Sequence, residues 1–200
     1  MTHILFLPGV GADPAFWRPV GDRLPAGWDK TYPGWPGLGH QPSDPAVRSV
    51  EDLIAYAAER LGEGATDVVG QSMGGLVALQ LALRYPGRVR RLVLAVTSGG
   101  IDMSGLGAAD WRPDYQREFP AAAPWIQDWR PDYTPDLSRV TQPALLLWGD
   151  ADPISPPAAG ERLRSLLPSA ELRIIQGGEH GLAVSHASEV ASLIQAHLGA

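Results

Sequence analysis

The sequence predicts an α/β fold in which a mostly parallel sheet of about six strands carries helices on both faces. Two patterns lead to this prediction. Short apolar runs typical of buried strands alternate along the chain with longer segments of helical character. In addition, the residues with catalytic chemistry follow predicted strands, which places them at the carboxyl ends of parallel strands, along one edge of the sheet.

The expected elements alternate along the whole chain. Strands are predicted at residues 3–7, 28–32, 66–70, 89–96, 143–148 and 171–175. Helices are predicted at residues 14–24, 50–61, 74–85, 157–167 and 187–198. The alternation is broken by an insert at about residues 99–138, which is predicted to be irregular. Since nothing like a domain linker interrupts the chain, we expect a single domain over residues 1–200.

Ser72 lies between a predicted strand and a predicted helix, in the pentapeptide GQSMG at residues 70–74. A serine at such a sharp turn needs small residues two positions before and after it, because Cβ atoms there would collide as the backbone doubles back. Gly70 and Gly74 meet that need, and Gly75 adds slack. The following helix is largely apolar, as expected for one packed on a sheet. The alternative interpretation is an ordinary glycine-rich turn.

Two later strands supply an acid and a base. The apolar run at residues 144–148 ends in a loop that contains Asp150 and Asp152. The strand at residues 171–175 is followed by a glycine-containing loop that presents His180. The order along the chain is therefore serine, aspartate, histidine. Residues far apart in the sequence converge in this way when their strands end at the same edge of an open parallel sheet.

Four segments, in this order, resemble motifs of the α/β-hydrolase superfamily, and the resemblance covers Ile4 to Leu198. They are FLPGVG at residues 6–11, similar to the HGxG oxyanion segment, PGLG at 36–39, similar to the PGxG turn, the serine pentapeptide, and the paired GxxD and GxH loops. One departure is Pro8, which replaces the usual histidine and removes a side chain that often braces the loop.

The resemblance implies that Ser72 is the nucleophile, His180 the general base and Asp152 the acid that orients the histidine. A serine hydroxyl is a weak nucleophile at neutral pH, so an imidazole must take its proton. The imidazole in turn needs a carboxylate on its other nitrogen to fix the tautomer and stabilise the transient cation. Asp150 stays open as the alternative acid.

The resemblance also implies an oxyanion hole made by the backbone amides of Val10 and Met73. Preorganised backbone donors of this kind stabilise the charge that develops on the carbonyl oxygen. The side chains at these two positions are expected chiefly to shape the pocket.

The insert at residues 99–138 stands where the superfamily places its cap, and here the cap is reduced. Its aromatic residues suggest an apolar lid over the active site, with Trp111, Trp125 and Trp129 as candidate substrate-binding residues. The alternative is that they only anchor a proline-rich excursion to the core. The pentapeptide WRPDY occurs twice in this insert, but a repeat this short does not establish a structural repeat.

Three classes of function compete. The leading one is hydrolysis of a small carboxylic ester through an acyl-enzyme on Ser72. The second is a lyase or synthase that uses the same three residues for proton transfer, and the third is a ligand-binding protein on the same fold. Dehalogenases and epoxide hydrolases with an aspartate nucleophile are disfavoured, because they require a carboxylate where Ser72 stands.

Composition restricts the remaining possibilities. The absence of cysteine excludes disulfides and thiol catalysis, and no histidine or carboxylate cluster has metal-ligand spacing, so we expect no metal and no cofactor. A net charge of −6 makes nucleic acid an unlikely partner. Neither a membrane span nor a signal peptide is recognisable, so we expect a cytoplasmic protein that acts on a small-molecule substrate. The sequence does not predict the oligomeric state.

Overall fold

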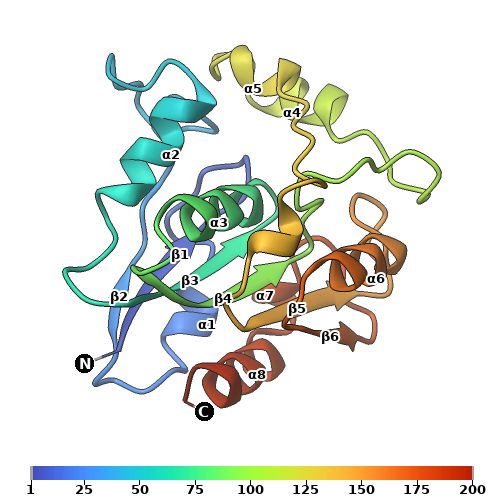
Figure 1. The fold of residues 1–200 in the computed structure, drawn as a ribbon. Helices are drawn as coiled ribbons and strands as arrows, with labels where there is room; N and C mark the ends of the chain where they lie inside the picture. Colours follow the sequence, from blue (N-terminus) through green and yellow to red (C-terminus); the bar gives the residue numbers. More distant parts are fainter. Residues whose placement is uncertain (1, 200) are drawn as a thin grey trace.

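Six parallel strands form one sheet in the order β2-β1-β3-β4-β5-β6 (Figure 1). In this computed structural model, which describes residues 2–199, the strands are β1 (His3–Leu7), β2 (Asp29–Thr31), β3 (Thr66–Gln71), β4 (Val89–Ala95), β5 (Ala144–Gly149) and β6 (Ala170–Ile175). The predicted six-stranded parallel sheet is therefore confirmed. Residues 1 and 200, at the ends of the predicted domain, lie outside the described residues.

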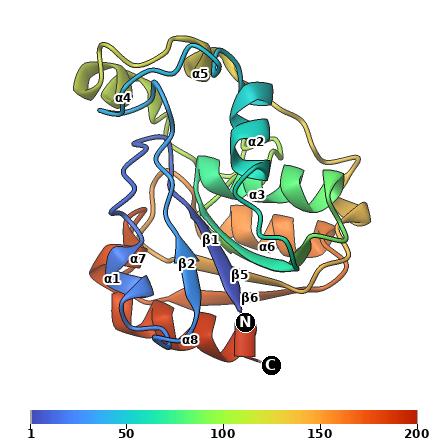
Figure 2. The same cartoon turned by 90° about the vertical axis from the view of Figure 1, so that its left-hand side faces the viewer.

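Helices cover both faces of the sheet, as Figures 1 and 2 show. One layer contains α2 (Val50–Ala58), α3 (Met73–Arg84) and α6 (Pro157–Leu166). The opposite layer contains α1 (Arg18–Gly21), α7 (Leu182–Ser185) and α8 (Ala187–Gly199). Two further helices, α4 (Arg112–Glu118) and α5 (Trp125–Asp128), lie at the top of both views, apart from these layers.

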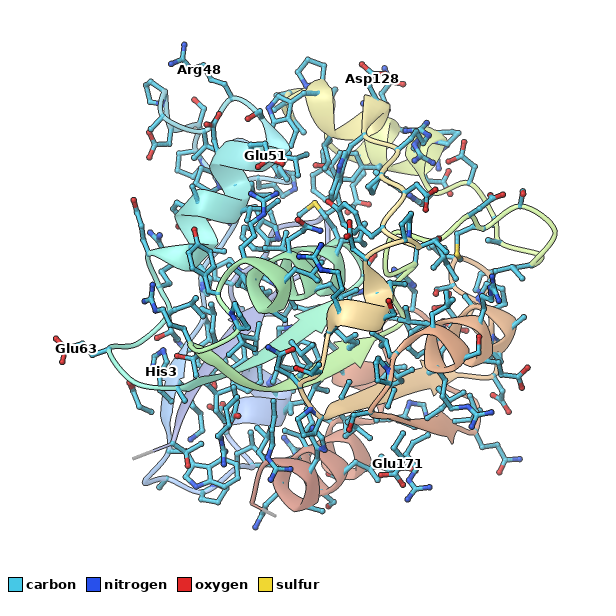
Figure 3. The ribbon with its side chains drawn as sticks, viewed as in Figure 1. His3, Arg48, Glu51, Glu63, Asp128 and Glu171 are labelled. Carbon is cyan, nitrogen blue, oxygen red and sulfur yellow. The ribbon has the colours of Figure 1, made fainter. Side chains whose placement is uncertain are left out.

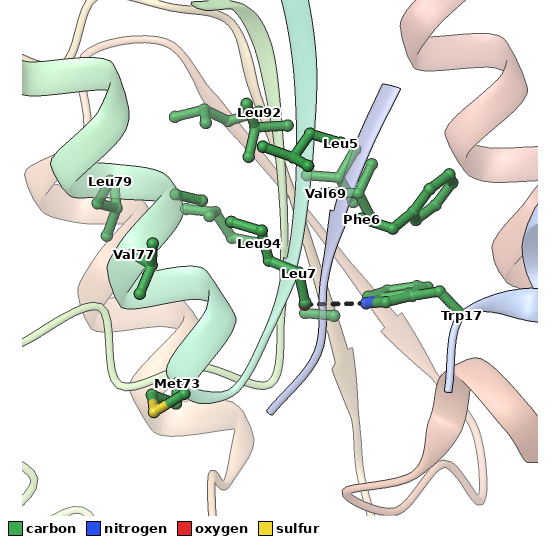
Figure 4. Packing of buried hydrophobic residues seen from close by; sticks show 14 of the residues in the cluster. Leu5, Phe6, Leu7, Trp17, Val69, Met73, Val77, Leu79, Leu92 and Leu94 are labelled. Carbon is green, nitrogen blue, oxygen red and sulfur yellow. Dashed lines mark hydrogen bonds between the residues drawn. The ribbon is translucent and has the colours of Figure 1, made fainter. Parts of the chain in front are cut away.

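The central strands are buried because helices cover them on both sides. Every residue of β3 and of β5 is buried, and β5 accordingly reads as a continuous apolar run without alternation. Figure 4 shows Val77 and Leu94 on the α3 side of β1, and Phe6 beside Trp17 on the other side. The rings of Phe6 and Trp17 have centroids 5.6 Å apart. This two-sided core fixes the strand ends that carry the site.

The first helix is shorter than the sequence predicts. Instead of residues 14–24, α1 covers only Arg18–Gly21. Before it, the amide of Phe16 bonds to the carbonyl of Asp13 and the amide of Arg18 to that of Ala15, a spacing typical of turns. Pro19 stands in the first turn of α1 and has no amide hydrogen to donate to the carbonyl of Ala15, so a helix that began at residue 14 would be interrupted there.

The insert is more regular than the sequence predicts, since it contains α4, α5 and a 3₁₀ turn at Leu137–Arg139. Pro113 stands in the first turn of α4, where its fixed φ favours helix initiation. The second copy of the duplicated pentapeptide, residues 129–133, is not helical. The two copies therefore adopt different structures and form no repeat.

Candidate active site

Ser72 occupies a strained turn between β3 and α3, with φ of 53° and ψ of −119°. A positive φ is unfavourable for a residue with a side chain, and such strain is found preferentially at functional sites. A Cβ atom on Gly70 would lie 2.4 Å from the carbonyl oxygen of Gly74, and one on Gly74 would lie 2.4 Å from that of Leu7. Both glycines are thus required by close backbone approach, as the sequence predicts.

Gly75 has a different role from the one expected. It does not add slack, because a Cβ atom there would lie 2.6 Å from the Cβ of the buried Thr97. Thr97 follows β4 by two residues. The missing side chain at Gly75 therefore lets the start of α3 pack directly on the chain leaving β4.

His180 and Asp152 are brought together by the loops after β6 and β5. The Nδ1 atom of His180 lies 2.8 Å from Oδ2 of Asp152, whose side chain is fully buried. The other oxygen, Oδ1, accepts hydrogen bonds from the amides of Ile154 and Ser155 at 2.8 and 3.1 Å. Both carboxylate oxygens are therefore used, one to hold the loop and one to hold the imidazole.

Asp150 is directed elsewhere. Its side chain is exposed, and its Oδ1 accepts a hydrogen bond from the amide of Gly177 at 2.6 Å. This contact ties the loop after β5 to the loop after β6. Of the two candidate acids, Asp152 is the one hydrogen-bonded to His180.

Ser72 and His180 line one cavity of about 560 Å³. Val10 and Met73 line the same cavity, as do two of the three predicted tryptophans, Trp111 and Trp129. Trp125 is half-buried against the core and is not among the lining residues. The cavity therefore gathers residues from the ends of β1, β3 and β6 and from the insert.

Two backbone amides lie where the cavity meets the serine turn. Helix α3 begins at Met73, so the amide of this residue has no partner four positions back within the helix. Val10 follows Gly9 at the end of β1, close to the serine turn. A Cβ atom on Gly9 would lie 3.3 Å from the Cβ of Ser72, so the chain between β1 and α1 runs directly beside the serine.

The side chain of Gln71 joins the serine turn to the histidine loop, and sequence reasoning overlooked it. Gln71 is buried, and its Nε2 donates a hydrogen bond to the carbonyl oxygen of His180 at 3.2 Å. Its Oε1 occupies the space beside Gly9, where a Cβ would approach it to 2.2 Å. The only signal in the sequence is its position directly before Ser72.

Two buried tryptophans brace the loop that lacks the usual histidine. The indole nitrogen of Trp17 donates to the carbonyl oxygen of Leu7 at 3.0 Å, a bond drawn in Figure 4. The indole nitrogen of Trp35 donates to the carbonyl oxygen of Pro8 at 2.8 Å. The support that a histidine at position 8 would give is thus supplied by residues from other parts of the chain.

The cavity has an apolar wall and a charged rim. The apolar wall includes Leu76, Val96, Ile101 and Ile126, and the charged lining residues are Asp102, Asp110, Asp132, Arg112 and Arg130.

Hydrogen bonds lower the pKa of two of the rim carboxylates, Asp102 and Asp110. Hydrogen bonds from Ser104 lower the pKa of Asp102, and the amide and guanidinium of Arg112 lower the pKa of Asp110. Arg112 bonds to Asp110 at 3.0 Å and to the carbonyl oxygen of Gln127 at 3.1 Å. Its charge is therefore already paired, which disfavours it as a free anchor for an acidic substrate.

The insert is fixed to the loops around the cavity. The hydroxyl of Tyr115 in α4 accepts a hydrogen bond from the amide of Gly39 at 3.0 Å, and burial raises the pKa of this tyrosine. The amides of Ala123 and Ala109 bond to the carbonyl oxygens of Gly37 and Pro153 at 2.8 and 2.7 Å. Different aromatic residues of the insert therefore hold it to the fold and line the cavity: Tyr115 does the first, and Trp111 and Trp129 do the second.

Residues 2–199 contain neither a metal-ligand cluster nor a membrane-spanning helix. No group of three or more histidine, aspartate or glutamate residues is arranged to hold a metal ion. No helix in this part of the chain combines the length and apolar character needed to cross a membrane.

Comparison with known proteins identifies relatives among hydrolases. Pimeloyl-[acyl-carrier protein] methyl ester esterase from Neisseria meningitidis serogroup B is 29% identical, with 96% of this chain and 91% of the relative covered. A poly(3-hydroxyalkanoate) depolymerase from Ectopseudomonas oleovorans is 27% identical, with 99% and 84% covered.

Solved structures share the fold at lower identity. A meta-cleavage product hydrolase from Pseudomonas fluorescens superposes with a TM-score of 0.79 at 19% identity and covers 100% of this chain and 91% of its own. A thermophilic esterase from Thermogutta terrifontis gives 0.77 at 22% identity, with 98% and 89% covered. The sequence profile of the family described as alpha/beta hydrolase fold matches residues 2–141 and 120–187. With its parallel sheet, its strained serine turn and this match over most of its length, the chain belongs to the α/β-hydrolase family.

Proposed function

We propose that this α/β hydrolase is a serine esterase that cleaves small carboxylic esters through an acyl-enzyme on Ser72. His180 is the general base, Asp152 orients the imidazole, and the amides of Val10 and Met73 form the oxyanion hole. The observation that carries the proposal is the 2.8 Å contact between His180 Nδ1 and Asp152 Oδ2, with the same histidine and Ser72 lining one cavity.

In the first half of the reaction, Oγ of Ser72 attacks the ester carbonyl carbon while Nε2 of His180 takes the hydroxyl proton. Because Nδ1 is bound to Asp152, Nε2 is the nitrogen left to face the hydroxyl. The negative charge that develops on the carbonyl oxygen is stabilised by the two backbone amides. Collapse of this intermediate expels the alcohol, which takes the proton from His180, and leaves the acyl group on Ser72.

In the second half, a water molecule gives its proton to His180 and attacks the acyl carbon. The carboxylic acid is released, and Ser72 recovers its proton from the imidazole. No cofactor enters this sequence of steps.

The cavity supports a small and largely apolar acyl group. Its volume of about 560 Å³ lies within the range usual for small-molecule sites. Ile101 and Ile126 contribute apolar surface, and Trp111 and Trp129 of the insert add aromatic surface. The relative named as a methyl ester esterase supports the choice of an ester as substrate. Location in the cytoplasm and the lack of a nucleic-acid partner stay predictions from the sequence.

The proposal is tested by a serine-reactive fluorophosphonate together with p-nitrophenyl esters of increasing acyl length. We expect the label on the peptide that contains Ser72, and turnover of the short esters. Ser72→Ala should abolish labelling and reduce turnover by about 10⁴-fold or more, since the residues of such a triad act as a unit. Thermal unfolding of the variant serves as the control for folding.

The competing classes give different results. Labelling at Ser72 without turnover of any ester would favour a lyase or synthase with the same triad. No labelling of the folded protein would favour a ligand-binding protein. Unchanged turnover in the Ser72→Ala variant would exclude Ser72 as the nucleophile.

A further inference from the structure

Strand β6 lies at the edge of the sheet and pairs only with β5 among the residues that the structure describes. Its backbone groups alternate in direction. The carbonyl oxygens of Ser169 and Ile175 accept bonds from the amides of Ala144 and Asp150, so odd-numbered residues of β6 bond towards β5. The amides and carbonyls of Ala170, Leu172 and Ile174 therefore point outwards, where they offer a free edge for a further strand.

The two faces of this edge differ in chemistry. Ala170, Leu172 and Ile174 form an apolar row on the α6 side, where Leu172 lies against Gly160. Ile174 is 44% exposed, one of the most exposed large apolar side chains of the described residues. On the opposite side of the strand, Glu171 forms an ion pair with Arg173, and Figure 3 shows Glu171 on the side of the sheet that faces away from α6.

We propose that this edge joins a second copy of the chain, with β6 pairing antiparallel to β6 about a two-fold axis at Leu172. The outward groups of Leu172 then face those of Leu172 in the second copy, and Ala170 faces Ile174. The two-fold axis makes one Leu172 pair and two pairs of Ala170 with Ile174. Each of these three pairs forms two backbone hydrogen bonds, which gives about six in all. The apolar row of one copy continues into that of the other.

The charges of the strand select this arrangement. In the same register, Glu171 of each copy lies directly opposite Arg173 of the other, at the close non-hydrogen-bonded positions of an antiparallel pair. Charges of a single sign on an edge strand repel a second copy. Glu171 and Arg173 carry opposite signs, and each faces the other residue of the second copy only when the two strands run antiparallel. Glu171 and Arg173 of one copy thereby replace the ion pair between them with ion pairs to the facing residues of the second copy.

The helix beside the strand carries the same pattern. A shallow groove next to β6 is lined by Glu161 and Arg164 of α6 together with residues of the strand. These two residues are three positions apart and so lie on one face of the helix. A two-fold axis reverses their order, which brings Glu161 of one copy towards Arg164 of the other. Charge complementarity on two neighbouring elements favours a second copy of this chain over an unrelated partner.

Sedimentation velocity over about 1 μM to about 1 mM tests the dimer, since weak self-association dissociates within this range. We expect the wild type to reach twice the mass of one chain. Arg173→Glu and Glu171→Arg each place like charges opposite one another and should weaken the dimer by about tenfold or more. The double variant Glu171→Arg/Arg173→Glu restores opposite charges and should dimerise like the wild type.

An equimolar mixture of the two single variants gives the sharpest result, because each supplies the charges that the other lacks. The mixture should form a heterodimer at concentrations where each variant alone is monomeric. These residues lie outside the proposed catalytic machinery, so unchanged ester turnover and thermal unfolding report that each variant is folded. If a single variant does not fold, Ile174→Lys replaces it and should also weaken the dimer.

Three results would overturn the proposal. These are a wild type that stays monomeric to about 1 mM, a dimer that both single variants leave unchanged, and a mixture that associates no better than its components.

Discussion

At the scale of single residues, Asp152 differs from Asp150 in what its two oxygens contact. Asp152 is buried, and it binds the imidazole of His180 through one oxygen and two loop amides through the other. Asp150 is exposed and binds the amide of Gly177. A carboxylate held from both sides keeps the imidazole in one orientation and one tautomer, with Nε2 directed away from Asp152.

Exchange of each aspartate for asparagine separates their roles. Asp152→Asn should reduce kcat/KM by about 10⁴-fold, as in a serine protease with the same three groups, because an amide favours the wrong tautomer and cannot stabilise the imidazolium. Asp150→Asn removes only an exposed charge and keeps an oxygen that can accept the Gly177 amide, so it should lower kcat/KM by less than about tenfold. Measurement of both variants on one activated ester decides between them, and a larger loss at Asp150 would reverse the assignment.

The sequence predicts the chemical groups of the site better than their supports. Ser72, Asp152 and His180 are recognisable because each stands in a short pattern in the loop after a predicted strand. Gln71 and Trp35 are not, because their contacts with His180 and Pro8 join segments 109 and 27 positions apart and depend on packing in three dimensions. Local patterns specify which groups are present, and tertiary contacts decide how they are held.

At the scale of elements, the strands and long helices are predicted best and the short ones worst. The fully buried strand β5 is visible as an apolar run, and α3 as an apolar helix. Helices of four residues, such as α5 and α7, span about one turn and leave no periodic pattern in the sequence. Their formation depends on the loops and side chains around them.

Helix α8 carries a histidine whose charge opposes folding. Burial lowers the pKa of His197, and the positive charge of Arg91 lowers it further. The folded state therefore prefers the neutral imidazole, whereas the unfolded chain binds a proton near pH 6.5. The stability that this residue contributes is present above that pH and is lost as the pH falls towards the lowered pKa of the folded state.

Replacement of this histidine tests the effect. His197→Gln keeps a polar side chain of similar length but does not titrate. Urea unfolding at about pH 7.5 and about pH 5.5 should show a larger loss of unfolding free energy in the wild type than in the variant. An equal loss in both proteins would show that other groups govern the acid side of the stability curve.

At the scale of the whole molecule, the insert both docks on the fold and completes the cavity. Tyr115 holds it to Gly39, while Trp111 and Trp129 face the cavity. The sequence alone does not decide whether the aromatic residues of the insert form a lid or anchor the insert, because composition does not show where each side chain points. The parallel sheet, in contrast, was predictable, since the alternation of strands and helices leaves few other topologies.

The three tryptophans of the insert provide a matched comparison. Trp111→Ala and Trp129→Ala remove apolar surface from the cavity and should lower kcat/KM for long acyl chains by about tenfold, with little change for acetyl esters. Trp125→Ala removes an aromatic ring of the same insert that does not line the cavity and should leave the preference for acyl length unchanged. A uniform loss in all three variants would indicate that they act only through the docking of the insert.

The parallel arrangement of all six strands determines how two copies joined through β6 would work. Because every strand ends at the same edge, the cavity, which Ser72 and His180 line, lies at one end of the sheet. An antiparallel junction turns the second sheet end over end, so the two mouths open in opposite directions. Each copy then receives substrate from its own side, and a bulky molecule docked at the cavity of one copy does not block catalysis by the other copy.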